Sequence, residues 1–171
     1  EAPKRGMTLV SATIDHGLQP GSAEVAEAAA RQAEELGMDA RVQRVAVSDA
    51  GGPEAAARAA RYAALSAIAH DVDAAAVLVA HTLDDQAETV LLGLARGSGA
   101  TSLQGMAAAS DLGGVPLLRP FLALTRTTTR AACTAQGLDP WDDPQNADLS
   151  YTRVRVRERV LPVLEAELGP G

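Results

Sequence analysis

The sequence predicts an α/β protein with a mostly parallel sheet and helices on both of its faces. Segments rich in β-branched residues alternate along the chain with segments whose apolar residues recur at helical spacing. The run Val77-Leu78-Val79-Ala80 is short and continuously apolar, which is typical of a strand buried inside a parallel sheet. Polar clusters follow two of the predicted strands, and ligands bind at the carboxyl ends of such strands.

The individual elements follow from the same patterns. The predicted strands are residues 7–15, 41–47, 77–80 and 115–118, the last at a sheet edge because it contains a proline. The predicted helices begin at Ser22 and after Gly51-Gly52-Pro53, and then cover 85–96, 125–136 and 152–168. Glycines at 37, 97 and 137 mark helix ends, and 97–114 is expected to be a loop that can include a short helical turn. We expect one catalytic core over 1–150 and the start of a helical region over 151–171.

Composition limits the function. The 171 residues carry a net charge of −7, which argues against nucleic-acid binding through a broad basic surface. The single cysteine, Cys133, excludes an internal disulfide and any paired-cysteine metal site within this sequence. No apolar run approaches the roughly 20 residues that span a membrane, and no signal-peptide pattern follows Glu1. A cytoplasmic protein fits these observations.

The densest polar cluster runs from His81 to Thr89, directly after a predicted strand. Asp85 and Glu88 are three residues apart at the start of a helix, so they share one face and could bind an ammonium group or Mg²⁺. The structural alternative is a capping box in which Asp85 caps the helix and Glu88 reaches back. His81 could transfer a proton or simply form a hydrogen bond at the strand end. Spacing alone leaves these alternatives open.

A second cluster, Asp15-His16-Gly17, ends the first strand. It could border a nucleotide, or it could be an Asx turn with Gly17 at positive φ. Arg58 and Arg61 lie one turn apart on a predicted helix, where one of them could reach a phosphate or a carboxylate and surface solvation is the alternative.

The sequence contains no convincing phosphate cradle. No lysine follows a glycine-rich loop. Gly97-Ser98-Gly99 follows a predicted helix, so it is expected to cap that helix rather than to bind a phosphate group. Near the C-terminus, Arg153, Arg155 and Arg157 could orient an RNA backbone or a triphosphate, or belong to a solvated helix. The segment before them is expected to be irregular and pinned by Trp141 and Asx turns. No metal site is predicted from cysteine and histidine spacing.

Six short motifs occur in order between about residues 8 and 165. They are Asp15-His16-Gly17-Leu18, Ala57-Arg58-x-x-Arg61-Tyr62, Ala80-His81-Thr82-Leu83-Asp84-Asp85-Gln86-Ala87-Glu88-Thr89, Arg96-Gly97-Ser98-Gly99, Arg119-Pro120 and Trp141-x-Asp143-Pro144-x-Asn146-x-Asp148. The series resembles that of the tRNA(Ile)-lysidine synthetases, which belong to the PP-loop superfamily of N-type ATP pyrophosphatases. The resemblance implies a Rossmann-like fold of the adenine nucleotide alpha-hydrolase type.

The resemblance also implies an activity. Such an enzyme uses ATP and Mg²⁺ to adenylate the wobble cytidine of a tRNA(Ile) with a CAU anticodon, and free L-lysine then replaces AMP to give lysidine. By this carry-over Asp85 and Glu88 hold the lysine, and Asp85, His81 and Arg61 line the reaction centre. Asp15 and His16 border the ATP, Arg153, Arg155 and Arg157 contact tRNA, and Asp84 supports the site. A homodimer is left open.

Two departures from the family pattern stand out. Val154 occupies a position between arginines where the family usually has Asn, which weakens the tRNA role of that segment. The family's phosphate loop, Ser-Gly-Gly-x-Asp-Ser, is absent, together with the central strand that precedes it. We therefore expect that the native protein has a further N-terminal segment and that these residues alone are inactive. A tRNA 2-thiolating enzyme of the same superfamily and a non-catalytic nucleotide- or tRNA-binding remnant are the alternatives.

Overall fold

The computed structural model describes residues 6–17, 19–46, 53–99 and 103–169. The chain forms two compact units, and each is described by itself. The first contains Glu1–Val77 and Asp111–Pro116, and the second contains Leu78–Ser110 and Leu117–Gly171. The expected division at residue 150 stays a prediction.

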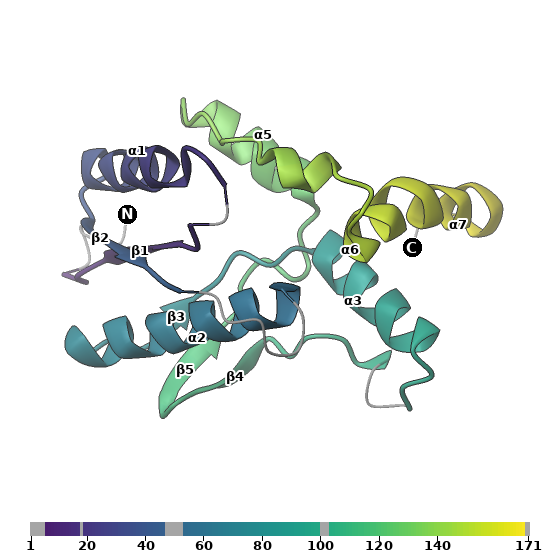
Figure 1. Cartoon of the computed structure of the whole chain (residues 1–171), viewed down its shortest axis with the longest axis horizontal. Helices are drawn as coiled ribbons and strands as arrows, with labels where there is room; N and C mark the ends of the chain where they lie inside the picture. Colours follow the sequence, from purple (N-terminus) through teal and green to yellow (C-terminus); the bar gives the residue numbers. More distant parts are fainter. Residues whose placement is uncertain (1–5, 18, 47–52, 100–102, 170–171) are drawn as a thin grey trace. The chain divides into compact units, whose positions relative to one another are not determined.

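The first unit is built around a pair of parallel strands. β1 and β2 pair in register from Val10 opposite Asp39 to Asp15 opposite Arg44. α1 packs on both strands and α2 packs on β1, and Figure 1 shows the two helices on opposite sides of this pair. The prediction of a parallel sheet with helices on both faces is therefore confirmed. The bounds are β1 Val10–Asp15, α1 Ser22–Glu35, β2 Asp39–Arg44 and α2 Pro53–Asp71.

A second sheet has three short strands in the order β3-β5-β4, with β3 at Val77–Leu78, β4 at Ala109–Leu112 and β5 at Val115–Leu118. Two expectations about it are wrong: 97–114 is not all loop, because it contains β4, and β5 is the middle strand rather than an edge. Pro116 is tolerated in β5 because β3 is so short. A hydrogen bond from Val79 N to Leu118 O joins the chain just after β3 to β5, two residues past the proline.

The turn between β4 and β5 explains why the sequence pattern hid a strand. Gly113 and Gly114 both have positive φ, 62° and 93°, which is the requirement of a two-residue hairpin turn. A Cβ on Gly113 would lie 2.8 Å from the Ser66 hydroxyl oxygen, which itself donates to Leu112 O. The strand before this turn, Ala-Ser-Asp-Leu, has little β propensity, so the hairpin is stabilised by its turn and its partners.

The second unit is mainly helical. The predicted helix over 152–168 is confirmed as one continuous helical stretch, but its middle is π-helical. The π segment ends just before Leu161-Pro162, where the proline ring removes a backbone donor and disturbs the preceding turn. The helical elements are α3 Leu83–Ala95, α5 Arg126–Ala135, the 3₁₀ helix η2 Pro144–Ala147, α6 Thr152–Arg155, the π segment η3 Val156–Val160 and α7 Leu161–Leu168.

Three helix ends were correctly predicted from glycine. Gly37, Gly97 and Gly137 follow α1, α3 and α5 with φ of 81°, 68° and 69°. At α3 the N–H of Gly97 donates to Leu94 O and that of Ser98 donates to Gly93 O, the paired bonds of a Schellman cap. The prediction that Gly97-Ser98-Gly99 ends a helix is confirmed.

The buried residues explain how a chain with 2% aromatic residues forms a core. Alanine supplies much of it in α1 and α2, where Ala26, Ala33, Ala64 and Ala69 are each at most 5% exposed. Small side chains let helices approach strands closely, so dispersion contacts accumulate without large residues. Within the described residues, no helix is both long enough and apolar enough to cross a bilayer.

Candidate functional site

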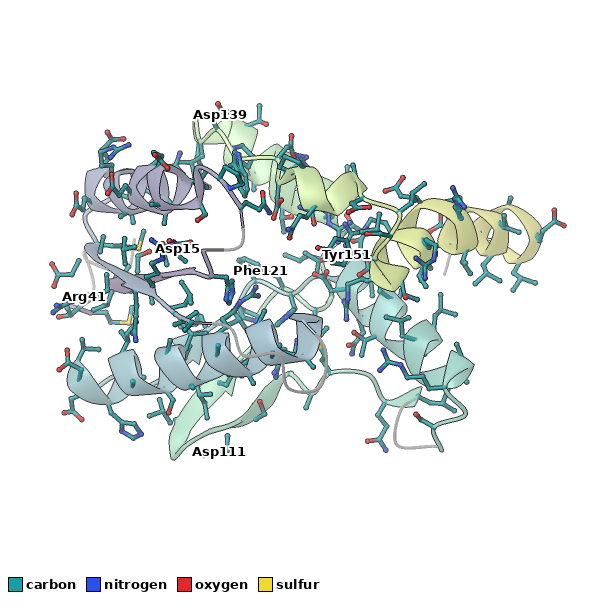
Figure 2. All side chains as sticks on the ribbon, viewed as in Figure 1. Asp15, Arg41, Asp111, Phe121, Asp139 and Tyr151 are labelled. Atoms are coloured by element: carbon teal, nitrogen blue, oxygen red, sulfur yellow. The ribbon has the colours of Figure 1, made fainter. Side chains whose placement is uncertain are left out.

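The carboxylate of Asp15 organises the end of β1. Figure 2 labels this residue, which is 5% exposed. Its Oδ1 accepts the N–H of Gly17 at 2.8 Å, and Arg44 Nε lies 3.9 Å from its Oδ2. The hydrogen bond from the Ser22 hydroxyl, followed by that from Gly17, lowers the pKa of Asp15. The Asx turn with Gly17 at positive φ, 63°, is thus confirmed.

His16 and Arg61 come together although 45 residues separate them. Arg61 Nε donates to His16 Nε2 across 3.3 Å. A guanidinium can only donate, so this ring nitrogen is the acceptor and the proton of the neutral imidazole resides on Nδ1. Burial, and then the positive charge of Arg61, lower the pKa of His16 and keep the ring neutral. Nδ1 is buried and has no hydrogen-bond partner among the described residues. Arg58 instead stacks on the Tyr62 ring at 4.9 Å.

The start of α3 is a capping box, but not the expected one. Thr82 is the N-cap, and Asp85 reaches back so that its Oδ2 accepts from the Thr82 N–H and hydroxyl, each at 2.8 Å. The expectation that Asp85 caps and Glu88 reaches back is wrong, because helix α3 begins two residues earlier than its periodicity indicated. Burial acts to raise the pKa of Asp85, but the two bonds from Thr82, with Arg126 and His81 nearby, lower it overall.

Glu88 has a different environment from Asp85. Its side chain is fully buried, and both carboxylate oxygens are paired, Oε2 with Arg153 Nη1 at 3.1 Å and Oε1 with Arg157 Nε at 2.7 Å. Burial acts to lower the pKa of Arg157, but the hydrogen bond to Glu88 raises it overall. The buried carboxylate therefore connects α3 to the helical stretch that begins with α6. Figure 1 shows α3 and α6 side by side.

Arg126 is a site residue that the sequence analysis missed. Its Nη2 lies 3.2 Å from Asp85 Oδ1 and 3.5 Å from Glu88 Oε1. Its backbone N–H donates to Asp84 Oδ2 at 2.7 Å, which shows what Asp84 supports: the first turn of α5. A signal was available, because an arginine at the first position of a helix opposes the helix dipole and needs a compensating anion.

The three arginines predicted to contact tRNA divide into two groups. Arg153 and Arg157 are four residues apart and share the face that reaches Glu88. Arg155 points elsewhere, and its guanidinium donates to Leu149 O, Ser150 O and Thr152 Oγ1. Their tRNA-binding role stays a prediction.

The segment before these arginines is ordered by Asx turns, as expected. Asp143 Oδ1 accepts from Gln145 N, and Asp148 Oδ1 accepts from Ser150 N. Trp141 does not pin the segment, because it is 54% exposed. The carboxylates hold this chain region through local backbone bonds, which need no core contact.

The candidate residues thus form two groups, each within one unit. Asp15, His16 and Arg61 are in the first unit. His81, Asp85 and Glu88, with Arg126 and the C-terminal arginines, are in the second. In the described part of the chain, no group of three or more His, Cys, Asp or Glu side chains could hold a metal ion.

Comparison with known proteins agrees with these motifs. Residues 1–164 match the model of the PP-loop domain family. The chain is 63% identical over 172 aligned residues to the tRNA(Ile)-lysidine synthase of Leifsonia xyli subsp. xyli, covering all of this chain and 51% of that protein. It is 58% identical to the synthase of the same name from Streptomyces coelicolor, covering all of this chain and 49% of that protein. The chain therefore spans about half the length of these relatives.

A solved structure shows the same fold at low sequence identity. The U34-tRNA thiolase NcsA from Methanococcus maripaludis, with its [4Fe-4S] cluster, superimposes with a TM-score of 0.76 at 15% identity, covering 96% of this chain and 58% of that one. This likeness concerns the fold, and it confirms the predicted α/β class. With its motifs, its parallel strands and its match over residues 1–164, the chain belongs to the PP-loop domain family.

Proposed function

We propose that this chain is part of a cytoplasmic ligase that joins free L-lysine to C2 of the wobble cytidine of a tRNA(Ile) with a CAU anticodon. The observation that carries the proposal is the 63% identity, over the whole of this chain, to a tRNA(Ile)-lysidine synthase. The order of the motifs supports it.

The proposed reaction has two steps. The cytidine O2 attacks the α-phosphorus of ATP, and pyrophosphate leaves. The ε-amine of lysine, after losing a proton, attacks C2, and AMP leaves with the former O2. Asp15 and His16 would border the nucleotide. Arg61 and His81 would line the reacting atoms, as the family resemblance implies.

Asp85 and Glu88 are the proposed lysine site, and their surroundings suggest unequal shares. Asp85 has a side chain that is 21% exposed, and its Oδ1 faces Arg126 rather than the capping box. The lowered pKa of Asp85 keeps it ionised, as an ammonium group requires. An incoming ammonium would compete with Arg126 for Oδ1. Glu88 is inaccessible while Arg153 and Arg157 occupy it, so it would contribute its charge from behind Asp85.

The test separates the two steps in the complete natural protein. Asp85→Ala should reduce lysine incorporation into tRNA at least about ten-fold more than it reduces ATP-dependent pyrophosphate release, because one lost charged hydrogen bond is worth about 1.5–3 kcal/mol. Glu88→Ala and Glu88→Gln are measured alongside, with thermal unfolding to identify a folding defect. Glu165→Ala, an exposed carboxylate on α7, is the matched control. Equal loss of both steps in Asp85→Ala would return Asp85 to a purely capping role.

The product distinguishes the alternative activity. A tRNA 2-thiolating enzyme would replace the C2 oxygen of a pyrimidine with sulfur, whereas the proposed ligase adds lysine. Mass spectrometry of the wobble nucleoside after incubation with ATP, lysine and a sulfur donor tells these apart. Cys133 is the only cysteine in the sequence, so a paired-cysteine mechanism has no second thiol within these residues. A non-catalytic remnant would yield neither product.

A further inference from the structure

A pocket of about 370 Å³ lies in the second unit, and it shares Arg153 with the surroundings of the proposed lysine site. Thr89, Leu92 and Gly93 of α3 line it, and these positions follow one face of the helix. Arg96 and Arg153 line it as well. The pocket therefore joins the end of α3 to the first turn of α6.

The lining of this pocket is cationic. Among the described residues no carboxylate lines it, although the chain as a whole has a net charge of −7. Arg96 is exposed and makes no ion pair with any described residue. Arg153 uses one Nη1 bond to hold Glu88, and its other N–H groups make no hydrogen bond within the described residues. A guanidinium has five such donors, so Arg153 can hold Glu88 and still present donors to the pocket.

Arg96 and Arg153 are the two cations of the pocket wall, and Arg153 also pairs with Glu88. Positive charge partly removed from water acts more strongly on an anion than the same charge on an open surface.

The backbone cannot take the place of these arginines. The N–H groups of Gly97 and Ser98 are used by the Schellman cap of α3, so they cannot cradle a phosphate. The C-terminal end of the α3 dipole also disfavours an anion. Thr89 donates its hydroxyl proton to Asp85 O, which leaves it only as an acceptor. Anion binding here depends on Arg96, Arg153 and the Ser98 hydroxyl, and it should weaken when one charge is removed.

The shape is held by an interaction outside the pocket. Gly105 forms one wall, and a Cβ there would lie 2.7 Å from the Gln86 side chain. Gln86 Nε2 donates to Met106 O at 3.0 Å, and its Oε1 accepts from Met106 N at 2.6 Å. This two-sided clamp fixes the 105–106 backbone against α3, so the pocket is preformed.

We propose that this pocket binds a phosphodiester of the tRNA backbone, with Arg96 and Arg153 as the phosphate ligands and the α3 face against the ribose. The proposal rests on the proposed function for the identity of the RNA. A pocket of this volume is larger than one phosphate group, and its mixed lining of guanidinium, hydroxyl and Leu92 suits a sugar-phosphate unit. A phosphate contact positions the RNA without reading its sequence.

The experiment measures RNA affinity as a function of salt, using the complete natural protein and an anticodon stem-loop RNA with a CAU anticodon. Each phosphate neutralised contributes roughly 0.7–0.9 to the slope of log K against log salt concentration. Arg96→Ala should weaken binding and reduce this slope by about one. Arg96→Lys should keep most of the slope because the charge remains. Arg96→Gln checks that the effect does not depend on the alanine variant.

Arg41→Ala is the matched control, because Arg41 is an exposed arginine of β2 in the first unit, away from the pocket lining, and the change removes the same charge. An unchanged slope in Arg96→Ala and Arg96→Gln, with folding intact, would overturn the proposal, and so would an equal fall in Arg41→Ala.

The proposed function has a separate readout. If Arg96→Ala still forms lysidine with an unchanged KM for tRNA, the phosphate-binding role of the pocket is contradicted and the proposed ligase activity is not. If the protein binds RNA in an Arg96-dependent way but forms no lysidine, the ligase activity is contradicted and the phosphate-binding role of the pocket is not.

Discussion

Arg157 Nε lies 2.7 Å from Glu88 Oε1, and Glu88 has no exposed surface at all. The two residues are 69 positions apart, so this bond is a tertiary contact between α3 and the π segment η3. Arg153 completes the pairing at Oε2. Around this carboxylate the guanidiniums of Arg126, Arg153 and Arg157 take the place of water, so each partner depends on the other.

The first prediction concerns this buried pair. Glu88→Ala should reduce the free energy of unfolding by about 3–5 kcal/mol, because it leaves Arg153 and Arg157 facing an apolar gap. Urea unfolding followed by circular dichroism measures it. Glu165→Ala, on the exposed side of α7, should change stability by less than about 0.5 kcal/mol. If Glu88→Ala lowers the free energy of unfolding by less than about 1 kcal/mol, Arg153 and Arg157 are solvated by water once the carboxylate is removed.

The second prediction concerns the capping box. Thr82→Ala should cost about 1 kcal/mol, since the Asp85 N–H loses its side-chain acceptor and Asp85 Oδ2 loses the hydroxyl donor. Thr82→Ser keeps the hydroxyl and should restore most of the loss. Asp85→Ala combined with Thr82→Ala should cost less than the sum of the single changes, because both remove one shared interaction. Additive losses would show that the two side chains act independently.

The third prediction is a pH dependence at His16. Because the folded-state pKa of His16 is lowered below 6.5, the unfolded chain binds the proton more readily. The contribution to stability is complete above pH 6.5 and is lost as the pH falls from there through the lower folded pKa. A titration of the ring proton by NMR reports that folded pKa directly.

Arg61 supplies part of this effect. Arg61→Gln should raise the pKa of His16, although burial keeps it below 6.5. Arg58→Ala is the control, because Arg58 lies one turn away and stacks on Tyr62 instead. If the two variants moved the His16 titration equally, the Arg61 contact would not be its cause.

The fourth prediction separates two reasons for a glycine. Gly17→Ala meets positive φ and also Arg44, whose Nη2 would be 2.9 Å from the new Cβ. Gly37→Ala meets positive φ, 81°, with nothing within 4 Å. In both variants, backbone strain at positive φ should lower the free energy of unfolding by about 1–2 kcal/mol. Gly17→Ala should lose more, because Arg44 must also leave Asp15. Equal losses in thermal unfolding would show that Arg44 moves freely.

The sequence by itself determined the local features of this protein. Helix ends at Gly37, Gly97 and Gly137 follow from glycine's access to positive φ, and the Asx turn at Asp15 follows from a side chain that reaches two residues ahead. The α/β class follows from periodicity, because the buried apolar residues of a helix and those of a strand recur at different spacings along the sequence. Motif order located the family, and the match over residues 1–164 agrees.

Tertiary structure decided the partners. Periodicity showed that Asp85 and Glu88 share a helix face, but it could not show that one is partly exposed and the other fully buried. That difference depends on Arg126, Arg153 and Arg157, which approach from 41 to 69 residues away. Periodicity also could not place β5 in the middle of its sheet, because strand order depends on pairing between segments and not on their composition. The charge of a side chain is a local property, whereas the water it loses is determined by whatever the rest of the chain packs against it.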